Sequence, residues 1–360
     1  MLFYKYSIST VIIVFTVQIL LGLPINQTPL CEVFTPKALY GDKVFQTSFV
    51  GDRSRFSTCG GVAWFHDDNY LASVNFEGGF ICTYKFNKSE NQFIPLQTIH
   101  HTEEAPLFSA ENLSFTSDGK LLAVSMNHSK QVNIYRVSPQ THLIDPEPVA
   151  IVRPKDRNVH GVRFSRDDRY LACTAVRGSN LVSIYKLEGY KPEACDTQEI
   201  SRKLELTPVS TLENRFLTSK PKSLDFSHDD RYVAVVYAVN VVSTPNKARG
   251  LIAIYTFDKE TGVIAPEPMS VYRSKQKFDG GEDINFSLDD SFVIISEHAQ
   301  DRIIIHEFDK TRGIIGKKVS EIKNPEAQLS FPHGLNISSD GKYLAVANYG
   351  DDKFSLYSIH

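Results

Sequence analysis

The chain has 360 residues, of which 42% are hydrophobic and 11% aromatic, so it is long enough for one large core or several small ones. Its 39 basic and 42 acidic residues leave a formal net charge of −3. This balance argues against a nucleic-acid-binding protein, because such a protein needs a basic face to displace counterions from phosphates.

The chain begins with an apolar segment, residues 1–23, in which Lys5 precedes a run from Val11 to Leu23. The run is short for a bilayer span and suits the apolar region of a secretory signal peptide. A clean small-x-small cleavage site does not follow it, so an uncleaved membrane anchor is an alternative, and a cytosolic chain is another. We predict a secreted, periplasmic or cell-surface protein that meets a membrane only through this segment, with residues 24–38 as a linker.

Export would permit disulfides, and the chain has five cysteines. Cys31 and Cys59 flank the start of the folded region and could pair with each other. Cys82 and Cys173 fall within predicted strands, where we expect them to act as small core residues.

One motif occurs six times after this segment, for example as VRFSRDDRYLA from Val162 and LNISSDGKYLA from Leu335. The shared aspartates of the copies are Asp67, Asp118, Asp167, Asp229, Asp289 and Asp340. Spacings of 49 to 62 residues between them are typical of propellers and repeat arrays. Because the acid recurs in every copy, we predict a structural role for it.

Each copy predicts four short strands. Alternating apolar residues form the first strand, and Ser-x-Asp-Gly or Ser-x-Asp-Asp forms a tight turn. In that turn the aspartate can accept a backbone N–H two residues on, and the next Gly or Asp tolerates a left-handed conformation. A nearly all-apolar second strand follows, and then a third strand with a recurrent aromatic position that we expect to pack between sheets. That position holds Tyr84, Tyr135, Tyr185, Tyr255, His306 and Tyr357.

Four short strands cannot form a stable unit alone, whereas stacking such sheets around an axis buries both faces of each. We therefore predict an all-β propeller of six four-stranded blades in one domain, residues 39–360. The chain stops after the third strand of the sixth copy, and residues 39–52 look like the missing fourth strand. The N-terminal segment would then close the ring. Seven blades are less favoured, because residues 188–221 are too few to supply another four strands.

The stretch HGLNISSDGKYLAVANYGDDKFSLY, residues 333–357, resembles the repeats of lactonase-like β-propellers, which also occur in surface-layer proteins with a Tyr-Val-Thr-Asn signature. The resemblance covers residues 40–360 and implies a propeller fold. It leaves activity open, because such repeats occur in hydrolases, in isomerising enzymes and in binding proteins. Lactonase-type members usually have seven blades, whereas this chain has six copies. A WD40 propeller is less apt, because the Gly-His and Trp-Asp pairs of that family are missing from the usual positions.

In a propeller, the loop into each first strand and the loop between second and third strands lie on one face of the ring. Seven residues before each repeat aspartate stand Gly60, Glu111, His160, Lys222, Glu282 and His333. Copies three apart are opposed in a six-bladed ring, so His160 should face His333, and Glu111 should face Glu282. The catalytic candidates are His160, His333, Glu111, Glu282 and Arg177. Candidate ligand-binding residues from the second-to-third loops are His128, Glu297, His298, Asn348 and Tyr349.

Other roles for these residues remain open. A His-Gly pair before a strand can serve only a tight backbone turn. No cofactor is predicted, and a divalent metal between the histidines is an alternative that requires its donors to lie within bonding reach. The long loop 238–250 of the fourth copy is either a lid or partner contact, or an insertion without function.

Two functions follow from this pattern. The first is an exported propeller that binds a small molecule or a protein partner on the channel face without turnover. The alternative, implied by the resemblance, is a lactone-type hydrolase with a histidine as base and an Arg or Glu that orients the substrate.

Overall fold

The computed structural model describes residues 58–155, 158–176, 181–190, 204–213, 216, 219–239, 250–273, 281–323, 329–351 and 353–359, and the backbone of four short strands between residues 33 and 51. These residues belong to a compact unit, Cys31–His360, whereas the other unit, Met1–Leu30, lies outside the described residues. The predicted signal segment, Cys31, Arg177 and most of loop 238–250 are also outside them. None of the helices in the described ranges has the length and apolar character needed to cross a membrane.

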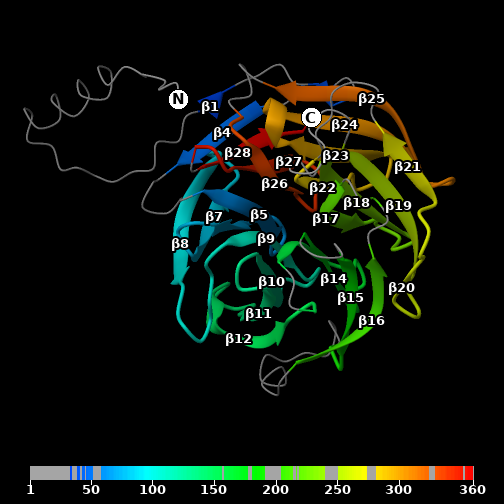
Figure 1. The fold of residues 1–360 in the computed structure, drawn as a ribbon. Coiled ribbons are helices and arrows are strands. Elements are labelled where there is room, and N and C mark those ends of the chain that lie inside the picture. The colour runs from blue at the N-terminus through cyan, green and yellow to red at the C-terminus, as the bar shows by residue number, and fades with distance from the viewer. Residues whose placement is uncertain are drawn as a thin grey trace, which may run out of the picture. The chain divides into compact units, whose positions relative to one another are not determined.

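Six small antiparallel sheets account for almost all strands of the described residues, and each sheet is one blade of the ring in Figure 1. Blade 1 consists of β5 (Cys59–Phe65), β6 (Tyr70–Asn75), β7 (Phe80–Asn87) and β8 (Gln92–His100). Blade 2 consists of β9 (Ala110–Phe115), β10 (Leu121–Met126), β11 (Gln131–Val137) and β12 (Ile144–Val152). Blade 3 consists of β13 (Val159–Phe164), β14 (Tyr170–Ala175), β15 (Leu181–Glu188) and β16 (Glu205–Glu213). Blade 4 consists of β17 (Ser219–Phe226), β18 (Tyr232–Val239), β19 (Leu251–Asp258), β20 (Val263–Ile264) and β21 (Ser270–Arg273). Blade 5 consists of β22 (Asp283–Phe286), β23 (Phe292–Glu297), β24 (Arg302–Asp309) and β25 (Ile314–Lys323). Blade 6 consists of β26 (Pro332–Ile337), β27 (Tyr343–Asn348), β28 (Lys353–Ser358), β4 (Gln46–Gly51) and β1 (Val33–Phe34).

The first strands of the blades form a closed inner ring. Strands β5, β9, β13, β17, β22 and β26 contact one another in this order, and β26 contacts β5 again. The outer part of blade 6 comes from the N-terminal segment, because β4 pairs antiparallel with β28 from Gly51 opposite Lys353 to Gln46 opposite Ser358. The predicted six-bladed propeller with N-terminal closure is therefore confirmed.

The closing strand differs in extent from the predicted stretch 39–52. It covers only Gln46–Gly51, because β2 (Leu39–Tyr40) and β3 (Lys43–Val44) form a separate two-stranded hairpin. A further strand, β1, pairs with the outer edge of β4 and lies inside the predicted linker 24–38. The compact unit accordingly begins before residue 39.

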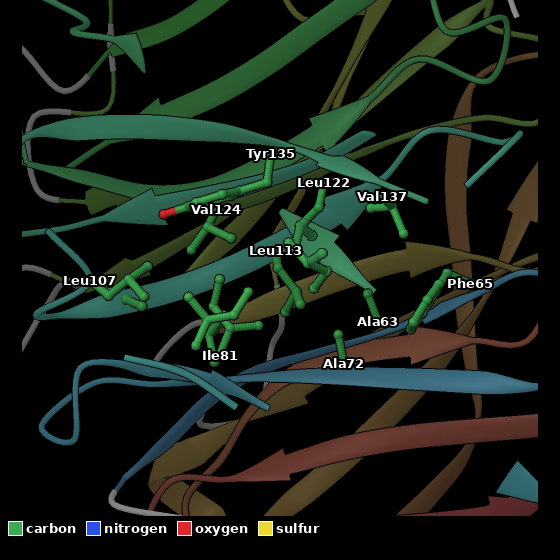
Figure 2. Packing of buried hydrophobic residues seen from close by; sticks show 14 of the residues in the cluster. Ala63, Phe65, Ala72, Ile81, Leu107, Leu113, Leu122, Val124, Tyr135 and Val137 are labelled. Carbon is green, nitrogen blue, oxygen red and sulfur yellow. The ribbon is translucent and has the colours of Figure 1, made fainter. Parts of the chain in front are cut away.

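Six hydrophobic clusters join each blade to the next one around the ring. Figure 2 shows the cluster between blades 1 and 2, where Phe65 and Ile81 of blade 1 face Leu113, Leu122 and Val124 of blade 2. Each fully buried side chain of this size contributes about 1.5–3 kcal/mol relative to exposure. Five of these clusters contain a tyrosine from the recurrent third-strand position, as predicted for packing between blades: Tyr84, Tyr135, Tyr185, Tyr255 and Tyr357.

The turn after each first strand has the predicted local structure in blades 2 to 6. In blade 3, for example, Asp167 accepts hydrogen bonds from the Ser165 hydroxyl at 2.7 Å and from the Arg169 N–H at 3.1 Å. The residue after the repeat aspartate has a positive φ, between 53° and 71° in these five blades. Glycine adopts this conformation without strain, and aspartate tolerates it.

Where the left-handed residue is an aspartate, it also links two blades, which the sequence analysis did not anticipate. Asp168 of blade 3 accepts from the Ser117 N–H of blade 2 at 2.8 Å and from its hydroxyl at 2.5 Å. Asp68, Asp230 and Asp290 accept in the same way from the turn of the preceding blade. We call these four residues the inter-blade aspartates. Gly119 and Gly341 stand at this position in blades 2 and 6, where they lie against side chains of the preceding blade, His66 and Leu288.

Replacement of one inter-blade aspartate tests this link. Asp168→Gly keeps the left-handed backbone but leaves the Ser117 N–H and hydroxyl without their acceptor, so we expect the free energy of unfolding to fall by about 1–3 kcal/mol. Asp168→Asn is the matched control. Burial raises the pKa of Asp168 to about 6. The protonated carboxyl therefore contributes stability at low pH, and this contribution is lost as the pH rises through about 6. Above that pH the neutral Asn side chain avoids the cost of a buried charge. At neutral pH we expect the Asn variant to be at least as stable as the wild type in urea denaturation. Equal stability of the Gly variant and the wild type would contradict the link.

Candidate active site

A β-bulge in the first strand directs one side chain toward the axis of the ring in blades 2, 3, 4 and 6. In blade 2, Ala110 pairs with Met126 and Asn112 pairs with Ser125, so Glu111 is an extra residue in the ladder. The same shift occurs at Gly60, at His160-Gly161, at Lys222 and at His333-Gly334, and Glu282 immediately precedes β22. Bulges re-aim side chains in this manner and are common near active sites.

These side chains meet on the axis, as the opposition of blades predicts. His160 Nε2 lies 3.7 Å from Glu111 Oε2 and 3.3 Å from Glu282 Oε2. His333 Nε2 lies 3.5 Å and 3.4 Å from the same two oxygens. The two imidazole rings are tilted by 32°, with their centroids 5.2 Å apart. All four side chains are buried, with at most 8% of their surface exposed.

Two further cationic or ionisable groups complete the site on its more exposed side. Lys222 Nζ lies 2.8 Å from Glu282 Oε2 and 3.1 Å from His160 Nε2. His298, in the 3-10 helix η2 (His298–Gln300), places Nδ1 2.7 Å from Glu282 Oε1. The Lys222 and His298 side chains are 21% and 23% exposed, so they form the solvent-facing edge. We call Glu111, His160, Lys222, Glu282, His298 and His333 the axial cluster.

The two opposed histidines differ in their affinity for a proton. Burial lowers the pKa of His160, and the Lys222 ammonium lowers it further. Burial acts in the same direction on His333, but the Glu282 and Glu111 carboxylates outweigh it and raise its pKa. Burial also disfavours ionised Glu282, yet Lys222 and the three imidazoles hold the pKa of this carboxyl well below its usual value. The axial cluster therefore keeps Glu282 negatively charged near neutral pH.

Neighbouring groups orient the cluster. The Asn127 amide donates to Glu111 Oε1 at 3.0 Å, and Asn158 donates to Asn127 Oδ1 at 2.8 Å. His333 Nδ1 lies 2.7 Å from the carbonyl oxygen of Gly60. Because a carbonyl oxygen can only accept a hydrogen bond, Nδ1 carries a proton and donates it to this oxygen. These contacts leave Glu111 Oε2 and His333 Nε2 directed at each other.

The second-to-third loops contribute unequally. Besides His298, Tyr349 lies beside the cluster, with its ring centroid 5.4 Å from that of His333. Burial, and then the nearby carboxylates of Glu111, Glu77 and Glu282, raise the pKa of Tyr349 to about 12. An aromatic rim continues from Tyr349 to Phe76, and from there to His128.

Three other candidates lie elsewhere or make local contacts. His128 is exposed on the rim, where Nδ1 lies 2.6 Å from the Ser109 hydroxyl. The buried Glu297 carboxylate accepts from Arg302 and from Gln300. Asn348 is also buried, and its amide donates to the Ser355 hydroxyl at 2.7 Å. Arg177 is outside the described residues. The functional roles of all these residues stay predictions.

A second polar layer, which the sequence analysis missed, lies below the axial cluster. The Arg163 guanidinium donates to Asp283 Oδ2 at 2.8 Å and to Asn112 Oδ1 at 2.6 Å, and its Nε lies 3.9 Å from Asp225 Oδ1. Arg163 and Asp283 are 4% and 1% exposed. The sequence contains a signal for this layer, because Arg163 stands four residues before its repeat aspartate, on the axial face of the first strand.

On the far side of Arg163, at the turn end of the first strands, lies a cavity of about 380 Å³. Its walls include Trp64, Phe65, Asp225, Asn285 and Asn336. The axial cluster and this cavity therefore occupy opposite ends of the axis, with the Arg163 layer between them.

Asn112, Asn285 and Asn336, which match glycosylation sequons, all lie in buried or half-buried first strands.

The fold and the carboxylate, imidazole and ammonium groups on its axis define a β-propeller with a cluster of ionisable side chains at the centre of the ring. A family model described as "Lactonase, 7-bladed beta-propeller" matches residues 152–360, which is more than half of the chain. The chain therefore belongs to this lactonase propeller family, although its described strands form six blades. His160, Lys222, Glu282 and His333 fall inside the matched region, and Glu111 precedes it.

Solved structures show the same fold at low sequence identity. A Bacteroides fragilis protein provisionally named 6-phosphogluconolactonase is 15% identical, with a TM-score of 0.57 and coverage of 90% of this chain and 89% of that one. A periplasmic gluconolactonase of Pseudomonas aeruginosa is 14% identical, with a TM-score of 0.52 and coverage of 82% and 97%. A protein from Lactobacillus plantarum is 14% identical, with a TM-score of 0.59 and coverage of 91% and 92%. Among curated proteins, no match to the chain is found.

The Arg163 layer can be tested by breaking its ion pair. Arg163→Met leaves the Asp283 carboxylate buried without its cation, so we expect the free energy of unfolding to fall by about 3–5 kcal/mol. Adding Asp283→Asn removes the uncompensated charge and should recover part of the loss. Urea denaturation of both variants checks this. A double variant that is no more stable than Arg163→Met would contradict the charge-pair explanation.

Proposed function

We propose that the protein hydrolyses a lactone of a sugar acid at the axial cluster. The observation that supports this most strongly is the convergence of two carboxylates, two imidazoles and one ammonium on the axis of a lactonase-family propeller. The names of the Bacteroides fragilis and Pseudomonas aeruginosa neighbours suggest the substrate class. Of the two functions predicted from the sequence, these findings favour the hydrolase over binding without turnover.

Glu282 is the carboxylate best placed to accept a proton from water. It lies between Lys222 and His298, the two members of the cluster that reach solvent, whereas Glu111 is held by the Asn127 amide. Lys222 carries the positive charge nearest to Glu282 and is the main group that lowers the pKa of this carboxyl. A lactone carbonyl oxygen bound by Nζ would draw the ammonium away from Glu282, which makes the carboxylate a stronger base. The same oxygen would gain electrostatic stabilisation as it becomes an oxyanion.

The reaction balances with these groups alone. Water gives a proton to Glu282 while its oxygen forms a bond to the lactone carbonyl carbon. The ring C–O bond then breaks, and the departing alkoxide takes a proton from Glu282. The products are the carboxyl and hydroxyl ends of one hydroxy acid, and the side chains return to their starting state.

Hydrolysis of a panel of aldonolactones by the purified full chain, followed as acid release in a pH-stat with the spontaneous rate subtracted, tests the proposal. We expect saturable turnover, and a loss of about 10²–10⁴-fold in kcat for Glu282→Gln. We also expect His160→Asn with His333→Asn to abolish turnover, because both imidazoles contact Glu282 Oε2 and hold this carboxylate in place. The matched controls are Glu103→Gln and His100→Asn, exposed residues outside the axial cluster, which should leave kcat unchanged. Saturable binding without hydrolysis would instead support a binding protein.

We also propose that the protein acts outside the cytoplasm. The apolar segment 1–23 supports this, as does the periplasmic location in the name of the Pseudomonas aeruginosa neighbour. Mass spectrometry of the mature N-terminus should show cleavage after the apolar run, and an intact Met1 in the culture's membrane fraction would indicate an anchor instead.

A further inference from the structure

We propose that the axial cluster is a metal site, in which Glu111, His160 and His333 hold a divalent transition metal, with Zn²⁺ as the ion that fits these ligands best. Two imidazoles and one carboxylate are a ligand set of catalytic zinc sites, which keep a fourth position open for water or substrate. The inference deepens the proposed function, because a metal here would polarise a lactone carbonyl and activate water. The binding itself does not depend on that function.

The distances between the three ligand atoms fit one ion. One ring nitrogen of His160, one of His333 and one carboxylate oxygen of Glu111 all lie within 4.8 Å of one another. Zinc bonds of about 2.0–2.2 Å place tetrahedral ligand atoms about 3.3–3.6 Å apart. The His333 nitrogen lies at this spacing from Glu111 Oε2, at 3.5 Å, and the His160 nitrogen lies slightly beyond it, at 3.7 Å. Glu282 Oε2 lies 3.3 Å and 3.4 Å from the same nitrogens, close enough to serve as a neighbouring base or a fourth ligand.

Two of the three ligands are oriented in the manner of metal ligands. A metal-bound histidine usually donates its other ring N–H to a carbonyl or carboxylate, which fixes the tautomer. His333 Nδ1 has this partner in the Gly60 carbonyl oxygen at 2.7 Å. The Asn127 amide occupies Glu111 Oε1 and leaves Oε2 for the ion.

The orientation of His333 also creates a need for a cation. With its proton on Nδ1, the neutral ring presents the Nε2 lone pair to the oxygens of Glu111 and Glu282. A buried lone pair that faces two carboxylates is unfavourable unless a proton or a metal ion lies between them. The proton is the alternative that the experiment must separate from the metal.

Lys222 is the cation that competes for this place. Its Nζ contacts Glu282 Oε2 at 2.8 Å and His160 Nε2 at 3.1 Å. A metal on His160 Nε2 would require Lys222 to give up that second contact, and its partly exposed side chain has room to turn toward solvent. Removal of the ammonium should therefore strengthen metal binding, whereas it should have no such effect if the cluster is only an ion-pair network.

The test uses the purified full chain, stripped with a chelator and titrated with Zn²⁺ by calorimetry and with Co²⁺ by absorption spectroscopy. We expect one ion per chain and the visible bands of a four- or five-coordinate cobalt. Asn127→Ala should weaken binding by about 10–100-fold, as loss of an outer-shell partner does. His333→Asn and Glu111→Gln should weaken it further, and Lys222→Met should tighten it. His100→Asn, which removes an exposed imidazole outside the axial cluster, is the matched control and should bind like the wild type.

Circular dichroism establishes that each variant is folded, and the isosteric Glu111→Gln carries the test if His333→Asn is not. Absence of binding in both the wild type and Lys222→Met would overturn the metal site, and so would binding that Glu111→Gln and His333→Asn leave unchanged. Lactone hydrolysis by chelator-treated, metal-free protein would overturn the metal's role and leave the hydrolase standing. Stoichiometric metal without hydrolysis of any lactone would support the metal site and overturn the proposed function.

Discussion

Contact between neighbouring blades is the constraint on which this structure depends. A single four-stranded sheet leaves too much apolar surface in water, so each blade is stable only between two others. A linear array would leave its terminal blades half covered. The pairing of β4 with β28 removes those ends, since it brings the N-terminal segment into the last blade. Closure therefore stabilises every interface, including those far from the two strands that make it.

Closure also creates the axial cluster. Its members come from blades 2, 3, 4, 5 and 6, so no blade and no pair of adjacent blades contains the site. The bulge at the start of the first strands turns the ligand-like side chains inward, and the ring brings side chains from different blades within 3.7 Å of one another. Burying so many ionisable groups is unfavourable unless they compensate one another. Lys222 and the imidazoles provide that compensation for Glu282.

The number of blades matters for the chemistry. A ring of six places blades in opposed pairs, whereas a ring of seven has no opposed pairs and a wider axis. His160 and His333 can lie with ring centroids 5.2 Å apart because blades 3 and 6 are opposed. Site residues of seven-bladed relatives therefore cannot be transferred to this chain by position alone. The residues that share its axis must be identified from its own ring.

The repeat, the four strands of each unit, the turn chemistry and the number of blades can all be derived from the amino-acid sequence, because each depends on short-range spacing that recurs six times. The sequence also identified the ring of Glu111, His160, Glu282 and His333, since opposition follows from the blade count. The extent of the closing strand, the links made by the inter-blade aspartates and the pairing of Arg163 with Asp283 became known from the three-dimensional structure. The tertiary structure also decided that Glu297 and Asn348 have local partners, while Lys222 and His298 meet Glu282. These features depend on side-chain directions between segments far apart in the chain, which repeat spacing does not specify.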